Sequence, residues 1–155
     1  IMDSVKIIQL PKILDSRGNL SFFENSNQIP FDIKRTYWIY DVPGGEMRGS
    51  HAFKESHEFI IALSGSFDIV LNDGENEMKY SLNRSYYGLY VPNLLWRSIE
   101  NFSTNSLALI ISDRNYDESD YIRDFDEFKK LDNIKYDIEV IDELKKNLYE
   151  IIASL

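Results

Sequence analysis

Cysteine is absent from the 155 residues, so the chain forms no disulfide and offers no thiolate for catalysis or metal binding. This absence is compatible with a reducing compartment, and we expect a cytoplasmic protein. Positive charge is also scarce. The formal net charge of -9 disfavours nucleic acid and anionic membranes as partners, because both require a basic surface. No apolar run reaches the length of a membrane span, and the first residues lack a signal-peptide pattern.

Aromatic and β-branched residues, in contrast, are plentiful. The hydrophobic content of 43% and the aromatic content of 14% argue against disorder and suit β-strands. In the turn sequence NDGE, Asp73 and Gly74 are expected to supply the positive φ angles of a tight hairpin. Strands are predicted in SVKIIQ, NLSFFE, RTYWIY, HEFIIAL, SFDIVL, EMKYSL, YGLYV, WRSIE and NSLALIIS. About nine short strands at this spacing indicate a sandwich or a barrel.

Only the C-terminal tail follows a helical period. Its apolar residues recur near the spacing of an amphipathic helix: Val140, Ile141, Leu144, Leu148, Ile151 and Ile152. Such a stripe must be covered, either by the barrel or by a second subunit. Because no linker or repeat interrupts the chain, we predict one domain, with residues 1–131 as its β-rich body and residues 132–155 as its helical tail.

The stretch RGSHAFKESHEF, at residues 48 to 59, carries a recognisable motif. Its spacing fits the first cupin motif, and PNLLWR fits the start of the second, with the matching positions Gly45, His51, Phe53, Glu58, Gly65, Pro92 and Arg97. A cupin metal site normally adds a second histidine at the position of Phe53 and a third at the position of Arg97. One imidazole and one carboxylate facing an arginine make a poor site for a transition metal, so we expect no metal.

Seven blocks of the chain occur in the order typical of one enzyme family. They are DSRGNL, IPFDIKRTYWIYDV, RGSHAFK, LSGSFDIVLNDG, YGLYVPNLLWR, NFS and YDESDYIRDFDEF, and together they cover roughly residues 7 to 130. In these blocks the chain resembles the WxcM-like sugar-nucleotide 3,4-ketoisomerases, which are related to the dTDP-4-dehydrorhamnose 3,5-epimerases. The chain departs from the family pattern at Phe53, where the family usually has a second histidine.

The resemblance implies both a fold and a function. The fold is an all-β cupin-type double-stranded β-helix, or jelly roll, here with a short C-terminal helical extension. The function is that of a homodimer, without a cofactor, that binds a dTDP-linked 4-keto-6-deoxyhexose and moves the ketone to C3. Such isomers serve the biosynthesis of deoxysugars and surface glycans. Cupin dimers of this kind commonly exchange N-terminal strands, so SVKIIQL is a candidate for pairing with the partner subunit.

Residue chemistry indicates how such an isomerase would work. A C–H next to a ketone is acidic enough for a neutral imidazole to remove its proton, provided that the developing enolate oxygen is stabilised. His51 titrates in the right range to be this base, with core packing as the alternative role. Arg48 supplies positive charge and Tyr37 a phenolic donor. We therefore predict His51, Tyr37 and Arg48 as catalytic residues.

Further residues are predicted to bind substrate. Arg48 belongs to this group too, and the resemblance to the epimerases implies a pyrophosphate contact for Arg17; the other candidates are Phe53, Glu58, Tyr90, Trp96 and Arg97. Phe53 is either core or a ring that stacks on the ligand. A buried Glu58 must find a donor, for which His51 is one candidate. His57 has the opposite strand parity and is expected to face solvent. The acidic stretch DESDYIRDFDEF has the composition of a solvated surface.

Three functions remain open from the sequence. The first is the 3,4-ketoisomerase, or a related sugar-nucleotide epimerase. The second is a sugar-nucleotide-binding cupin in which Phe53 marks the loss of catalysis. The third is a cupin with metal-dependent or purely structural work, which elemental analysis would reveal.

Overall fold

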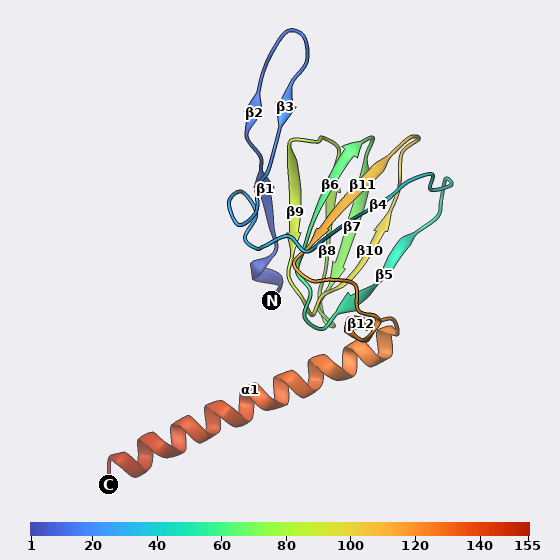
Figure 1. The fold of residues 1–155 in the computed structure, drawn as a ribbon. Coiled ribbons are helices and arrows are strands. Elements are labelled where there is room, and N and C mark those ends of the chain that lie inside the picture. Colours follow the sequence, from blue (N-terminus) through green and yellow to red (C-terminus); the bar gives the residue numbers. More distant parts are fainter.

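Two five-stranded antiparallel sheets form the body of the protein (Figure 1). The computed structural model describes the backbone of residues 1–155 and the side chains of residues 1–131 and 138–155. The first sheet has the order β1 (Lys6–Gln9), β9 (Tyr87–Val91), β6 (Glu58–Ser64), β11 (Leu107–Ser112), β4 (Arg35–Ile39). The second sheet has the order β12 (Tyr121–Ile122), β5 (Arg48–Phe53), β10 (Trp96–Glu100), β7 (Phe67–Asn72), β8 (Glu77–Leu82).

The remaining elements are short, with one exception. β2 (Lys12–Ile13) and β3 (Leu20–Ser21) pair with each other as a separate hairpin. Two 3-10 turns, Met2–Ser4 and Glu118–Asp120, precede β1 and β12. The long helix α1 spans Phe125–Ala153. No helix in the part of the chain that the structure describes is long and apolar enough to cross a membrane.

Alternation along the strands places one face of each sheet in a shared core. β7 shows this directly, because Phe67, Ile69 and Leu71 are buried while the residues between them are partly exposed. Their side chains pack against those of Ile60 and Ile110 from the other sheet. This packing of sheet against sheet is the cupin jelly roll that the sequence predicted.

A second layer covers the outer face of the first sheet. Leu10, Ile29 and further residues of the N-terminal segment pack on Phe59, Ile61 and Ile111. β6 is therefore buried on both faces along most of its length, which explains why HEFIIAL reads as a nearly continuous apolar run.

Two local features bear on the sequence expectations. The connection between β7 and β8 has four residues, and the Asp73 N–H donates a hydrogen bond to the Asn76 carbonyl within it. Among these four residues only Gly74 has a positive φ angle, of 102°. The predicted hairpin between β7 and β8 is therefore present, but the expected positive φ angle of Asp73 was wrong. In addition, β1 pairs with β9 within this chain, and the exchange of N-terminal strands between subunits stays a prediction.

The C-terminal helix begins within the acidic stretch, earlier than the predicted tail. Asp124 is its N-cap, since the carboxylate accepts a hydrogen bond of 3.0 Å from the Glu127 N–H. Phe125 and Phe128 in the first turn pack against Trp96 on the outer face of β10. The rest of the helix runs away from the body (Figure 1), and its predicted apolar stripe stays exposed within this chain.

Candidate active site

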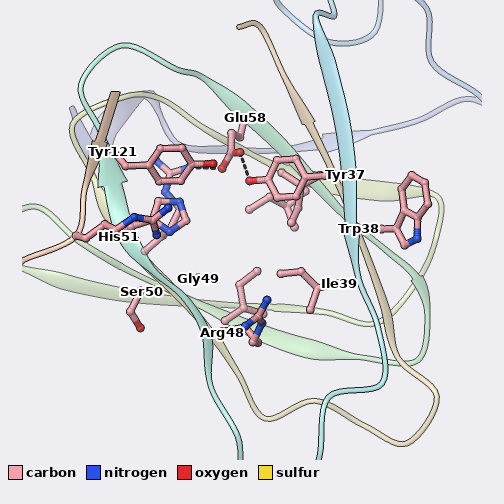
Figure 2. A pocket seen from close by; sticks show the side chains of 14 residues that line it. Tyr37, Trp38, Ile39, Arg48, Gly49, Ser50, His51, Glu58 and Tyr121 are labelled. Carbon is pink, nitrogen blue, oxygen red and sulfur yellow. Dashed lines mark hydrogen bonds and ion pairs between the residues drawn. The ribbon is translucent and has the colours of Figure 1, made fainter. Parts of the chain in front are cut away.

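A cavity of about 310 Å³ opens between the two sheets and gathers side chains of both (Figure 2). Its lining comes from β4, β5, β6, β10, β11 and the segment at β12. The lining residues are Tyr37, Trp38, Ile39, Arg48, Gly49, Ser50, His51, Glu58, Ile60, Arg97, Ile99, Ile110, Tyr121 and Arg123. The volume lies at the lower end of the range typical of small-molecule sites.

Strand parity explains why the polar residues of this cavity converge. Tyr37 on β4, Glu58 on β6 and Arg97 on β10 all occupy positions whose side chains point between the sheets. Arg97 is the direct cross-strand partner of His51. Four residues that are distant in the sequence thus meet in one place.

Glu58 is the centre of a buried hydrogen-bond network. Arg97 Nη1 donates to Glu58 Oε1 over 2.8 Å, and the Tyr37 hydroxyl donates to Glu58 Oε2. Arg97 Nη2 also donates to the carbonyls of Pro92 and Leu95, each over 3.3 Å. Burial raises the pKa of Glu58 despite the opposing effects of Arg97 and Tyr37. Burial likewise raises the pKa of Tyr37, to which the neighbouring carboxylate contributes.

His51 was a predicted hydrogen-bond donor to Glu58, and this prediction was wrong, because Arg97 and Tyr37 donate to the two carboxylate oxygens. His51 itself is buried, and its Nε2 has no hydrogen-bond partner among the described residues. Burial, together with the positive charges of Arg97, Arg123 and Arg35, lowers the pKa of His51 to about 3. The imidazole is consequently neutral at physiological pH, which is the form required of a general base. The expectation that His51 titrates in the usual range of such a base was wrong, because burial and the nearby arginines disfavour the imidazolium.

Aromatic rings hold His51 in place. Its ring lies 4.7 Å from the ring of Phe53 at an interplanar angle of 78°, and 5.0 Å from that of Tyr121. Phe53 is fully buried and also lies under the Arg97 guanidinium, 5.0 Å from its ring centre. The structure therefore places Phe53 behind His51 as packing, outside the residues that line the cavity.

Three arginines line the cavity, and Arg48, at its mouth, differs from Arg97 and Arg123 in its ion pairing. Arg97 is paired with Glu58, and Arg123 with Glu118 over 2.6 Å. No ion pair joins Arg48 to any of the residues whose side chains are described. A second, more open hollow of about 400 Å³ shares Trp38, Ile39 and Arg48 with the cavity. Arg48 thus stands at the junction of two spaces, where it can bind an anion.

Metal binding has little support from the side chains present. Among the described residues, no group of three or more His, Cys, Asp and Glu lies close enough together to hold a metal ion. Glu58, at the cupin ligand position, is instead paired with Arg97.

The sequence and the fold both have close relatives. Residues 3–133 match the FdtA family, described as WxcM-like, C-terminal. The chain is also 41% identical over 125 residues, which are 81% of this chain and 90% of the relative, to the TDP-4-oxo-6-deoxy-alpha-D-glucose-3,4-oxoisomerase of Aneurinibacillus thermoaerophilus. The chain belongs to the FdtA family.

Solved structures agree with this assignment. A 3,4-ketoisomerase from Helicobacter canadensis has a TM-score of 0.82 at 42% identity, covering 84% of this chain and 98% of that one. The sugar 3,4-ketoisomerase QdtA from Thermoanaerobacterium thermosaccharolyticum, in complex with TDP, has a TM-score of 0.84 at 34% identity, covering 88% and 99%. These family members confirm the predicted family, fold and isomerase class. A dTDP-4-dehydrorhamnose 3,5-epimerase from Bacillus anthracis shares the fold at 16% identity with a TM-score of 0.68.

Four residues predicted to bind substrate lie outside the cavity of this FdtA-family chain: Phe53, described above, and Trp96, Tyr90 and Arg17. Trp96 and Tyr90 sit next to inward-facing residues in their strands and therefore point outward, Trp96 against Phe125 and Tyr90 against the ring of His57. Arg17 lies near the tip of the β2–β3 hairpin, where it is 89% exposed and pairs with Asp15. Any contact of these residues with a ligand stays a prediction.

The sequence analysis also missed the roles of Tyr121 and Arg123 in the cavity lining, as well as two polar contacts. Tyr121 and Arg123 belong to the acidic stretch that was expected to be a solvated surface. The same stretch contains Asp120, which is buried and accepts a hydrogen bond of 2.8 Å from the Glu55 N–H. His57, expected in solvent, is half-buried and pairs with Asp113 over 2.9 Å. The presence of this stretch among the seven family blocks was the available signal.

Proposed function

We propose that the chain is a 3,4-ketoisomerase of a dTDP-linked 4-keto-6-deoxyhexose, acting in deoxysugar or surface-glycan biosynthesis in the cytoplasm. The observation that carries the proposal is a neutral, buried His51 in a cavity shared with Tyr37, Glu58 and Arg97. Related enzymes bear the names of TDP-sugar 3,4-ketoisomerases, and one of them binds TDP. No metal or cofactor takes part in the proposed reaction.

The proposed reaction moves one hydrogen from C3 to C4 and one from the oxygen at C3 to the oxygen at C4. The substrate as a whole is neither oxidised nor reduced. His51 takes the proton from C3, the electron pair forms the C3–C4 double bond, and negative charge moves to the oxygen at C4. The intermediate is an enediol, in which the oxygens at C3 and C4 are equivalent. A proton returned to C4, together with transfer of the C3 hydroxyl hydrogen to the oxygen at C4, leaves the ketone at C3.

The residues around His51 have distinct roles in this proposal. Arg48 stabilises the developing enediolate, because a charged donor favours a nascent oxyanion. The Tyr37 hydroxyl joins it when its single hydrogen turns from Glu58 to the substrate oxygen. Glu58 and Arg97 are positioning residues: Glu58 holds the Tyr37 hydroxyl and Arg97 holds Glu58. This arrangement gives the carboxylate a role that does not depend on a metal.

The proposed substrate spans both spaces at the mouth. The hexose occupies the inner cavity beside His51, the diphosphate lies at Arg48, and the nucleoside extends over the outer hollow. Trp38 and Met47 line that hollow and are exposed, so they offer apolar contact area to a base. An arginine without an acidic partner at the junction fits a diphosphate in geometry and charge.

We also propose a homodimer in which the β2–β3 hairpin lies on a second copy. The hairpin stands away from the body (Figure 1), and it exposes Ile13, Leu14 and Leu20. Cover by a second copy would remove this apolar surface from water, and it would deliver Arg17 to a neighbouring subunit. Arg17 would then contribute to a phosphate site outside its own chain.

Two histidines provide a matched test of the isomerase proposal. His51→Asn and His57→Asn each remove one imidazole, but His57 lies on the outer face of the first sheet. Turnover of TDP-4-keto-6-deoxyglucose is followed by NMR in deuterated water, together with exchange of the C3 hydrogen. His51→Asn is expected to lower both rates about 10²–10⁴-fold while TDP still binds, and His57→Asn to retain them. Equal rates in wild type and His51→Asn would refute the proposed base.

A sugar-nucleotide-binding protein without turnover is the second candidate, and Phe53 in place of the usual second histidine is the observation that favours it. In that case the wild-type chain binds TDP and the 4-keto sugar nucleotide, yet neither product nor C3 exchange appears. Product formation by the wild-type chain excludes this candidate.

A further inference from the structure

The distal part of α1 extends beyond the family fold. The family match ends at residue 133, and the Helicobacter canadensis and Thermoanaerobacterium thermosaccharolyticum structures cover 84% and 88% of this chain. The helix nevertheless continues to Ala153. Its distal residues are therefore not needed to build the body or the cavity, and their apolar side chains require a separate explanation.

Those apolar side chains follow a strict coiled-coil rhythm. Alternate steps of three and four residues separate Ile141, Leu144, Leu148, Ile151 and Leu155, which is the spacing of the a and d positions of a heptad. All of them are exposed; Leu144, for example, retains 62% of its accessible surface. A globular body of this size buries such a row when it can, and here the helix leads it away from the body (Figure 1).

The charges along this segment limit which partners can cover these apolar side chains. Residues 138–155 carry the acidic side chains Glu139, Asp142, Glu143 and Glu150 against only Lys145 and Lys146. An anionic membrane attracts amphipathic helices that are rich in basic residues, so a lipid surface is disfavoured. Val140 and Ile152, at the g and e positions beside the seam, are also apolar and exposed, so a partner helix can cover them together with the a and d residues.

We propose that a second copy of this chain covers the seam, with the two α1 helices side by side and parallel. In this arrangement Lys145 lies next to Val140 of the second copy, and no like charges face each other at the flanks of the seam. The antiparallel alternative, with Leu144 against Leu148 of the second copy, brings the two Lys145 side chains together. Charge therefore selects the parallel arrangement.

The seam reinforces a dimer rather than creating one alone. Within the helix, which ends at Ala153, the seam from Ile141 to Ile151 is about 15 Å long at the helical rise per residue. Two short helices of this length pair weakly in isolation, but a body that already associates raises their effective concentration. The inference depends on association of two copies and not on the isomerase activity, so the two can fail independently.

The absence of cysteine makes a direct test possible. In a parallel pair the two Leu148 positions face each other at about 6 Å between Cα atoms, within disulfide range. Leu148→Cys is therefore expected to cross-link into a covalent dimer under mild diamide at least tenfold faster than Lys146→Cys, whose side chain points away from the seam. Equal rates for the two variants would overturn the proposal, and so would rapid cross-linking only in a mixture of Leu144→Cys with Leu148→Cys, which marks antiparallel helices.

A second measurement addresses the strength of the contact. The double variant Leu144→Asp/Leu148→Asp places charges in the seam without touching the body, so its near-ultraviolet circular dichroism should match that of wild type. Sedimentation velocity across a dilution series is expected to show a dimer dissociation constant at least tenfold higher in this variant. A dissociation constant equal to that of wild type would overturn the proposal even if the body remains dimeric. Asp142→Asn/Glu143→Gln, on the outer side of the helix, is the control and should leave the constant unchanged.

Discussion

Arg97 and Glu58 form a buried ion pair across the two sheets, with 2.8 Å between Nη1 and Oε1 and with 2% and 1% of their side-chain surfaces exposed. Arg97 comes from β10 of the second sheet and Glu58 from β6 of the first. The pair thus connects the sheets at the inner end of the cavity. Because a buried charge without a partner is costly, the two residues depend on each other.

Removal of Arg97 alone should be strongly destabilising. Arg97→Met leaves the Glu58 carboxylate with only the Tyr37 hydroxyl, and the free energy of unfolding is expected to fall by about 3–5 kcal/mol. The double variant Arg97→Met/Glu58→Gln removes both charges and should recover most of this loss. Urea denaturation at neutral pH measures both values. Equal stability of the single and double variants would contradict the coupling.

The depressed pKa of His51 has a consequence for acid stability. The folded pKa is about 3 and the ordinary value is 6.5, so between these values the unfolded chain binds the proton and the folded chain does not. Stability is therefore lost as the pH falls from 6.5 towards 3. His51→Asn lacks this penalty, and relative to its own value at pH 8 it should lose ~3 kcal/mol less than wild type by pH 4. Parallel stability curves for the two proteins, measured by urea denaturation, would be inconsistent with a buried neutral imidazole.

Replacement of single arginines should distinguish a residue that contacts the phosphates from one that affects affinity only through the net charge of the protein. Arg48→Gln is expected to weaken TDP binding at least about tenfold, since a charge-assisted hydrogen bond contributes on the order of 1.5–3 kcal/mol. Arg17→Gln should also weaken binding if the hairpin reaches a second copy. Arg84→Gln, at an exposed site between β8 and β9, makes the same charge change and serves as the control. Titration calorimetry gives all three affinities, and a variant with wild-type affinity removes its arginine from the site.

The packing of Phe53 behind His51 predicts a specific effect of restoring the usual histidine. In Phe53→His a second imidazole lies beside the first, so the ratio of product formation to C3 exchange should change. Phe53→Leu is the matched control, because it alters packing and removes the contact with Arg97 without adding a proton carrier. NMR in deuterated water measures both rates. The same ratio in the two variants would assign the effect to packing alone.

The sequence predicted much of the cavity because the cupin motifs lie on strands of the two sheets that face one interior. His51, Glu58 and Arg97 are spaced so that three strands direct them to one interior, and the fold follows from that spacing. Trp96 and Tyr90 were predicted to line the mouth of the barrel, with a place in its core as the alternative, although alternation with Arg97 and Leu89 already pointed their side chains outward. Strand parity was the better guide to these two positions.

Other parts of the structure follow from tertiary contacts that composition does not reveal. The acidic stretch appears solvated in the sequence, yet Asp120 accepts hydrogen bonds from the Glu55 and Ser56 N–H groups and thereby holds β12 against β5. That contact brings Tyr121 and Arg123 into the lining of the cavity. The start of α1 was missed for a similar reason, because the capping Asp124 lies among other acidic residues.

The strand order has a consequence for how the protein reaches its working state. β4, which carries Tyr37, pairs only with β11, and β5, which carries His51, pairs with β10 and β12. Each of these pairings closes a long loop of chain, and such loops form slowly because their entropy is lost before any contact compensates for it. The cavity is therefore among the last features to form during folding. A refolding chain should regain its β-sheet circular dichroism before it regains ligand binding.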